Sequence, residues 1–262
     1  TICNSIASLR KLDYPKDRLE IIIVNDGSKD QTSSQVRGCM RKGDNVIFLD
    51  NKFNKGKAAC LNQGILASHG KYIATMDADS EVDQDILRKT IPHFDNPKVG
   101  AVTVSVEVKD PKTFLERLID IEYIIGLSLS LKGLSFINAI NVTPGPFSIY
   151  SRKVLDRIGL FDAASITEDL EIAYRLQKHR YRIENCTTTK VRTVIPKTLK
   201  GLYIQRKRWY SGALLTLIQH KDLILDTGVG PFSVVMPFTF LLTSLGLFLF
   251  GYSTYLIVYN LF

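Results

Sequence analysis

The chain has 262 residues, of which 45% are hydrophobic, and this length is ample for one large core or for one domain with an appendage. The net charge is +8, from 34 Lys and Arg against 26 Asp and Glu, so phosphates, nucleic acid or an anionic membrane are all compatible partners. Cys3, Cys39, Cys60 and Cys186 have neither CxxC spacing nor a dense framework, which argues against structural zinc and favours a reducing compartment.

An amphipathic helix is predicted at the start of the chain. Within residues 1–12, Ile2, Ile6 and Leu9 fall on one side of a helix. The sequence opens on Thr1 rather than Met and shows no signal peptide, so we expect that the natural N-terminus has been cut away.

Strands and helices alternate in the segment that follows. Apolar runs bounded by polar turns predict the strands 19–26, 45–50, 71–79 and 99–108. The segments between them predict the helices 32–42, 57–70 and 83–94. This order predicts an α/β fold in which a mostly parallel sheet is flanked by helices.

Acidic residues follow two of the predicted strands. Asp26 ends the first, and the pair Asp77 and Asp79 ends the third. Because ligands of such sheets collect at the carboxyl ends of the strands, we expect these acids on different strands of one sheet, at its ligand-binding edge. The pair alone fits a solvated turn, a calcium loop, a phosphate–metal site or a catalytic dyad.

Two loop motifs can be excluded. An EF-hand loop needs Gly and Glu at positions that hold Val82 and Arg88. A Walker A loop needs Gly where Asn51 stands and Ser or Thr where Ala58 stands, and no GxGxxG follows the predicted strands. What remains for the acidic pair is a solvated turn or a site for Mg²⁺ or Mn²⁺, which take one or two carboxylates plus phosphate oxygens.

A long helix is predicted for residues 113–134, where apolar residues recur at helical spacing. Its apolar side could lie against the bilayer or against the catalytic domain. Residues 141–147, with prolines on both sides of Gly145, end the helical pattern.

The C-terminal segment 227–262 is predicted to cross a membrane. No charged residue follows Asp226, and the apolar run exceeds the ~20 residues that a bilayer requires. A basic cluster directly before the span indicates the cytoplasmic side, so the preceding domain is expected in the cytosol and in contact with membrane lipid. The cluster comprises Lys197, Lys200, Arg206, Lys207, Arg208 and Lys221.

Motifs along nearly the whole chain carry a family resemblance. They are VNDGSKDQT, NKGKAACLNQG, MDADS, TPGPFSIYSRKVL, TEDLEIAYRL and QRKRW, in this order. The set resembles inverting, membrane-embedded family 2 glycosyltransferases, above all the processive cellulose, hyaluronan and poly-N-acetylglucosamine synthases. This resemblance implies a GT-A-like nucleotide-sugar-binding domain in residues 1–195 that lacks its first strand, a basic amphipathic interface segment in 196–226, and a transmembrane segment in 227–262.

The resemblance also implies roles for the acidic and basic residues of the cleft. Asp26 is expected to bind the nucleobase, and Lys57 to lie near the base or the diphosphate. Asp77 and Asp79 are expected to hold the sugar nucleotide and its metal ion, whose charge stabilises the departing diphosphate. Asp169 is expected to act as the general base for the acceptor hydroxyl.

Five further positions in the matched motifs are expected to contact substrate. Glu168 precedes the base, and taken alone both acids would only stabilise a helix that Thr167 caps. In the QxxRW motif, Arg208 is suited to bidentate bonds with a diphosphate, and Trp209 to stacking on the acceptor sugar. The remaining expected substrate contacts are Gly145 and Gln205, whereas Arg206 and Lys207 are expected to face lipid.

The implied reaction transfers a sugar from a nucleotide-diphosphate sugar, UDP-GlcNAc or UDP-Glc, to a growing polysaccharide or lipid-linked acceptor, assisted by Mg²⁺ or Mn²⁺. No nucleic acid is expected, because the positive charge is clustered beside the span. One alternative is a polyprenyl-phosphate glycosyltransferase, which adds a single sugar to a lipid and ordinarily lacks QxxRW. A catalytically inactive membrane scaffold is the alternative of another class.

Overall fold

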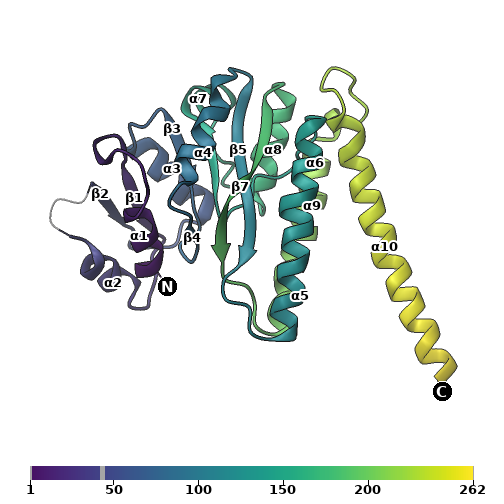
Figure 1. Cartoon of the computed structure of the whole chain (residues 1–262). Helices are drawn as coiled ribbons and strands as arrows, with labels where there is room; N and C mark the ends of the chain where they lie inside the picture. Colours follow the sequence, from purple (N-terminus) through teal and green to yellow (C-terminus); the bar gives the residue numbers. More distant parts are fainter. Residues whose placement is uncertain (1, 42–44, 262) are drawn as a thin grey trace.

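The computed structural model describes residues 2–41 and 45–261 of the chain, and its described part forms two sheets flanked by helices, with a long helix at the C-terminal end (Figure 1). Residue 1 of the first predicted helix, residue 42 of the second and residue 262 of the predicted membrane segment lie outside the described residues.

The N-terminal part contains a two-stranded parallel sheet. Strands β1 and β2 pair from Ile21 with Val46 to Asn25 with Asp50. Helix α1 contacts α2, and α3 contacts β1. The helices end earlier than the sequence pattern predicted, and the bounds are α1 Ile2–Arg10, 3₁₀-helix η1 Lys16–Arg18, β1 Ile21–Asn25, α2 Thr32–Cys39, β2 Val46–Asp50 and α3 Lys57–Ala67.

A mixed five-stranded sheet forms the centre of the domain, in the order β3-β6-β5-β7-β4. β5 and β7 are parallel, but β6 is antiparallel to both of its neighbours, and β4 is antiparallel to β7. The strands are β3 Tyr72–Thr75, β4 Glu81–Val82, β5 Val99–Val108, β6 Ser148–Ser151 and β7 Arg182–Thr193.

The α/β class is therefore as predicted, but two details of the prediction are wrong. The central sheet is not mostly parallel, because the unpredicted strand β6 lies antiparallel between β3 and β5. The strands that precede Asp26 and Asp77 also belong to different sheets, since β1 pairs with β2 and β3 pairs with β6.

Strand β5 is buried on both faces, which explains its continuous apolar sequence. Val102, Val104 and Val106 pack in one core cluster with residues of α4 and of α5 (Phe114–Tyr123). Ala101 packs in a second cluster with residues of α7 and α8 on the opposite face. The helices around the sheet are α4 Ile86–Thr90, 3₁₀-helix η2 Ile91–Asp95, α7 Arg152–Ile158 and α8 Glu168–Lys178.

The predicted helix 113–134 is present as three consecutive helical segments. They are α5 Phe114–Tyr123, the π-helix η3 Ile124–Ser130 and α6 Leu131–Phe136. Thr113 begins α5 with a capping box, in which its hydroxyl accepts from the Glu116 N–H at 3.2 Å and Glu116 accepts from the Thr113 N–H at 2.8 Å. The predicted break at 141–147 is a loop that leads into β6.

Two long helices complete the chain. Helix α9 (Leu199–Gln219) leads through the 3₁₀-helix η4 (Lys221–Leu223) to α10 (Phe232–Leu261). The start of α10 packs on α8, where Phe232 and Met236 lie against Tyr174, and the rest of the helix projects away from the domain (Figure 1). Within the described part of the chain, one helical stretch, Phe232–Ile257, is long and apolar enough to cross a membrane.

A disulfide joins Cys3 of α1 to Cys39 of α2, with 5.9 Å between the Cα atoms. The prediction of a chain in a reducing compartment did not foresee this bond. The pairing arises because α1 and α2 pack against each other, which the separation of the two cysteines in the sequence does not indicate. Cys60 and Cys186 are free and buried.

Candidate active site

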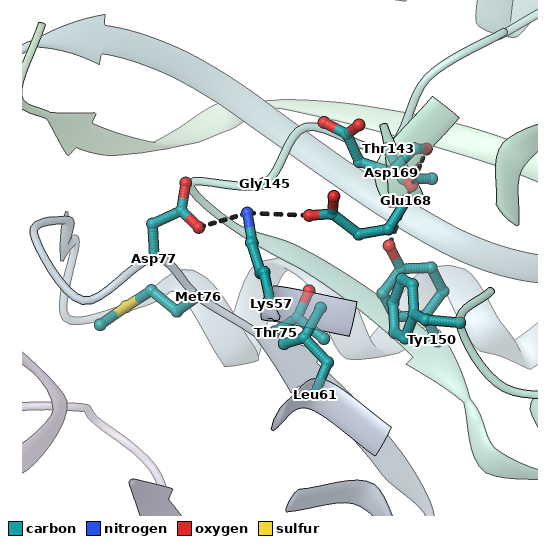
Figure 2. A pocket seen from close by; sticks show the side chains of 11 residues that line it. Lys57, Leu61, Thr75, Met76, Asp77, Thr143, Gly145, Tyr150, Glu168 and Asp169 are labelled. Carbon is teal, nitrogen blue, oxygen red and sulfur yellow. Dashed lines mark hydrogen bonds and ion pairs between the residues drawn. The ribbon is translucent and has the colours of Figure 1, made fainter. Parts of the chain in front are cut away.

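Lys57 lies at the centre of a pocket built from three separate segments (Figure 2). Its Nζ is 2.6 Å from Asp77 Oδ1 and 3.0 Å from Glu168 Oε1. Lys57 is the first residue of α3, Asp77 lies in the turn after β3, and Glu168 begins α8. Partial burial opposes the charge of Lys57, but the Asp77 and Glu168 carboxylates outweigh it and raise the pKa of the ammonium.

Hydrogen bonds to the backbone carbonyl of Asp169 hold this residue in the pocket. Its carbonyl oxygen accepts from the Thr143 N–H at 3.1 Å and from the Thr143 hydroxyl at 2.8 Å. The buried Tyr150 hydroxyl donates to Thr143 Oγ1 at 2.9 Å, and the Leu170 N–H donates to Asp169 Oδ1 at 3.0 Å. These bonds fix the start of α8 to the loop before β6 and leave most of the Asp169 carboxylate available to a ligand.

The environment of Asp169 favours the protonated carboxyl. Burial raises its pKa to about 6, and the neighbouring Glu168 carboxylate acts in the same direction. Lys57 opposes this effect, whereas the Asp77 charge adds to it. A carboxyl group with a pKa of about 6 is suited to taking up a proton near neutral pH.

Gly145 lines the same pocket from the loop between α6 and β6. A Cβ atom at this position would lie 2.7 Å from Lys57 Nζ and 3.1 Å from Asp77 Oδ2. A larger residue would therefore displace the ion pair. The absence of a side chain allows the loop to approach the charged groups closely.

Asp26 has a different position, outside the residues that line this pocket. Its carboxylate accepts from the Lys55 N–H at 2.6 Å and from the Gly56 N–H at 3.1 Å. These bonds hold the turn that leads directly into Lys57 and α3. The adjacent Gly27 has φ +68°, and a Cβ there would lie 2.5 Å from the Phe53 backbone.

Asp77 and Asp79 fit the role of a metal-binding pair by their chemistry. Burial raises the pKa of Asp79, and the negative charge of Asp77 acts in the same direction. Within residues 2–41 and 45–261, no three His, Cys, Asp or Glu side chains are grouped so that they could hold a metal ion. Two carboxylates are nevertheless sufficient for Mg²⁺ or Mn²⁺ when phosphate oxygens complete the shell.

Trp209 of the QxxRW motif packs between α9 and α5. Its ring centre is 6.3 Å from that of Tyr123, and the Arg206 guanidinium lies 4.4 Å from the centre of the Trp209 ring. Arg206 also pairs with Glu122 at 2.8 Å and is only 18% exposed. The prediction that Arg206 faces lipid is therefore wrong, because this residue joins α9 to α5.

Gln205, Arg208 and Trp209 do not line the pocket of Lys57 and Asp169. Arg208 is exposed, and Gln205 lies one turn before Trp209 on the same side of α9. Burial raises the pKa of Tyr123, and the negative charge of Asp77 reaches the same group. Tyr123 therefore packs against the QxxRW helix through Trp209.

The structure thus brings together five of the residues that the sequence pointed to, whereas Asp26, Asp79 and the three QxxRW residues do not line the pocket. Lys57, Asp77, Gly145, Glu168 and Asp169 line it. Sequence reasoning did not single out three further residues: Thr143, Tyr150 and Tyr123. Tyr123 follows Ile119 by four positions on the apolar side of its helix and could have been found from that spacing.

Comparison with known proteins shows the family of the chain. Residues 1–159 match the model of the family described as Glycosyl transferase family 2, and the chain belongs to that family. The predicted family and enzyme class, a family 2 glycosyltransferase, are confirmed.

Among individual proteins, the chain is similar to poly-beta-1,6-N-acetyl-D-glucosamine synthases. The protein of Staphylococcus epidermidis is 32% identical over 220 residues, which cover 84% of this chain and 53% of the relative. That of Staphylococcus aureus strain COL is 32% identical over 237 residues, covering 90% and 57%. The chain spans about half the length of the curated relatives it matches.

Solved structures confirm the GT-A-like fold. The mannosyltransferase PcManGT from Pyrobaculum calidifontis, in complex with GDP-Man and Mn²⁺, has a TM-score of 0.71 at 20% identity, covering 97% of this chain and 76% of that chain. TarS 1–349 of S. aureus, in complex with UDP-GlcNAc, has a TM-score of 0.60 at 18% identity, covering 91% and 69%. At these identities the likeness concerns the fold alone.

Proposed function

We propose that this protein is a membrane-bound, inverting glycosyltransferase that adds sugars from a nucleotide-diphosphate sugar to a growing polysaccharide. The observation that carries the proposal is the convergence of Lys57, Asp77 and Asp169 in one pocket from three separate elements. Similarity to poly-beta-1,6-N-acetyl-D-glucosamine synthases favours UDP-GlcNAc as the donor, with UDP-Glc as the other candidate.

Lys57 and the acidic turn form the donor side of the proposed site. Lys57 would exchange part of its pairing with Asp77 for the donor diphosphate, because a phosphate oxygen is an equally good partner for an ammonium. Asp77 and Asp79 would hold Mg²⁺ or Mn²⁺, which supplies positive charge to the leaving diphosphate. Asp26 would support this side by fixing the turn before Lys57 while facing the nucleobase.

Asp169 would act as the general base on the acceptor side. Its carboxylate takes the proton of the acceptor hydroxyl while that oxygen bonds to the anomeric carbon, and the bond from this carbon to the diphosphate oxygen breaks. The attack on the face opposite the leaving group inverts the anomeric configuration. The raised pKa of Asp169, about 6, suits this proton transfer.

Residues of α9 are proposed to complete the acceptor end. Arg208 is exposed and can offer its planar guanidinium to a phosphate. Trp209 lies against Tyr123, and Gln205 is on the same side of α9, one turn earlier. Their expected contacts with the acceptor sugar are therefore proposed to occur beside Tyr123, at the edge of the pocket.

The domain organisation that we propose follows the predicted division into residues 1–195, 196–226 and 227–262. The first part catalyses on the cytosolic side of the cell membrane, and the last crosses the bilayer. Large apolar residues of α9 are exposed, which supports contact between the middle segment and lipid. They include Leu199, Tyr203, Ile204, Leu214, Leu215 and Ile218.

The proposal is tested with the membrane-embedded protein and a panel of nucleotide sugars, with Mg²⁺, Mn²⁺ or EDTA. Diphosphate release is measured, and products are separated by size. A ladder of long polymers with UDP-GlcNAc or UDP-Glc is expected. A single sugar on a polyprenyl lipid would replace the proposal with the lipid-carrier transferase, and no release from any donor would favour an inactive scaffold.

A further inference from the structure

Helices α8 and α9 meet along a buried seam. On α9, Gly212, Thr216 and the following His220 are buried, and their spacing of four residues places them on one side of the helix. On α8, Thr167 and Glu171 have the same spacing and are also buried. The helix that carries the QxxRW motif therefore lies directly against the helix that carries Asp169.

The near end of this seam is a contact between Gly212 and Thr167. A Cβ atom built on Gly212 would lie 2.4 Å from Thr167 Cγ2, 2.6 Å from its Oγ1 and 3.0 Å from its Cβ. Real side chains do not tolerate such distances, so Ala at position 212 requires one helix to move. Thr167 directly precedes Glu168 and Asp169, so the movement would also shift these two residues.

The far end of the seam is anchored by buried charges. Glu171 accepts from Arg175 Nε at 2.7 Å and pairs with His220 Nε2 at 3.2 Å. Arg175 donates in addition to the Ile158 carbonyl at 3.0 Å and to the Leu160 carbonyl at 2.7 Å. Because α8 is tied to both α9 and the segment after α7 at this end, a change at Gly212 is taken up at the Thr167 end.

We propose that Gly212 is a positioning residue of the transferase: by having no side chain, it sets the separation of α9 from Thr167 and thereby the position of Asp169 relative to the acceptor. This inference rests on the proposed role of Asp169 as general base. Gly212 would thus influence the reaction although it has no functional group. The contact between α8 and α9 would align the QxxRW motif with Asp169.

A cycle of variants tests the proposal. Thr167 stands at the N-cap of α8, but its hydroxyl makes no cap hydrogen bond and its buried Oγ1 has no partner among the described residues. Thr167→Ala therefore removes the two atoms nearest to position 212 without breaking a cap bond. Gly212→Ala is expected to lower kcat by ~10- to 100-fold, since displacements of about 1 Å have such effects. Adding Thr167→Ala is expected to restore most of the loss.

Donor affinity separates positioning from a general defect. Lys57 and Asp77 come from α3 and the turn after β3, and only Glu168 joins Lys57 to α8, so kcat of Gly212→Ala is expected to fall by a larger factor than donor affinity, measured with UDP-GlcNAc. Gly133→Ala in α6 is the matched control, because a Cβ there meets no described atom within 4 Å. This control is expected to leave kcat unchanged.

Two results would overturn the positioning role: wild-type kcat in Gly212→Ala, or a double variant that stays as slow as Gly212→Ala. If Gly212→Ala fails to accumulate in membranes, the double variant is compared with Thr167→Ala, and equal kcat values support the proposal while a large difference contradicts it. A wild-type protein that transfers no sugar from any donor overturns the proposed function itself, whereas an active wild type with an unaffected Gly212→Ala overturns only this inference.

Discussion

The ammonium of Lys57 and the carboxylate of Asp77 lie 2.6 Å apart, although one belongs to a helix start and the other to the turn after a strand. Glu168 completes the contact at 3.0 Å from the same nitrogen. At the proposed donor site, the Lys57 ammonium is therefore paired with two carboxylates. A diphosphate can replace one of these carboxylates, because it is also an anionic partner for the Lys57 ammonium.

Replacing Lys57 by Ala is expected to weaken donor binding by ~10- to 100-fold, which corresponds to the loss of one hydrogen bond to a charged group. The measurement is calorimetric titration of the membrane-solubilised protein with UDP-GlcNAc in Mn²⁺. Lys52→Ala removes the same charge from an exposed position in the preceding loop and serves as the control. Equal donor affinity in Lys57→Ala and wild type would remove Lys57 from the donor site.

The activity of the enzyme is expected to depend on pH through Asp169. Its pKa is raised to about 6 by burial and by Glu168, so the carboxyl is protonated, and inactive as a base, below that pH. The value of kcat/KM, which reports the free enzyme, should therefore fall as pH drops through about 6 and level off above it. Glu168→Gln removes the neighbouring charge and is expected to move this limb to lower pH, whereas a limb near the ordinary Asp value of 3.8 would contradict the assignment.

Asp169→Asn is expected to reduce kcat by ~10² to 10⁴, the usual contribution of a general base. The fold should survive, because Thr143 bonds to the backbone carbonyl of Asp169 and not to its side chain. Donor affinity and the thermal midpoint are measured beside the rate. Asp156→Asn, an exposed substitution of the same kind in α7, is the control, and full activity of Asp169→Asn would refute the base.

The fold could be predicted from the sequence where a strand is continuously apolar, and less well elsewhere. β5 is buried on both faces, and its ten residues Val99–Val108 carry the pattern from end to end. β6 has only the four residues Ser148–Ser151, and β7 includes Lys190 and Arg192 among its Thr residues, so neither has a clear apolar signal. The direction of β6 in the sheet depends on its two partners, which the local sequence does not encode.

The candidate site could also be predicted only in part. Motif residues with charged side chains, such as Lys57 and Asp169, were identified by resemblance and lie together in the structure. The contacts that hold them were not predicted, because Thr143 binds a backbone carbonyl and Gly212 acts through the space it leaves. Neither interaction leaves a pattern in a single sequence. The Cys3–Cys39 bond was missed for the same reason, since it follows from helix packing.

Thr143 is expected to stabilise the position of Asp169 through its hydroxyl. This group donates to the Asp169 carbonyl at 2.8 Å and accepts from the buried Tyr150 hydroxyl at 2.9 Å. Thr143→Val keeps the shape of the side chain but leaves the Tyr150 hydroxyl without this acceptor, which should cost about 1–3 kcal/mol of unfolding free energy. Because the start of α8 also loses a bond, kcat should fall more than donor affinity.

Thr143→Ser keeps the hydroxyl and distinguishes hydrogen bonding from packing. Both variants are compared by thermal unfolding in detergent, by kcat and by donor titration. Ser at position 143 is expected to recover most of the rate lost with Val, because it can still link the Tyr150 hydroxyl to the Asp169 backbone. If Ser and Val were equally slow, restoring the hydroxyl would not restore the rate, and the link from Tyr150 through Thr143 to the base would have no separate catalytic consequence.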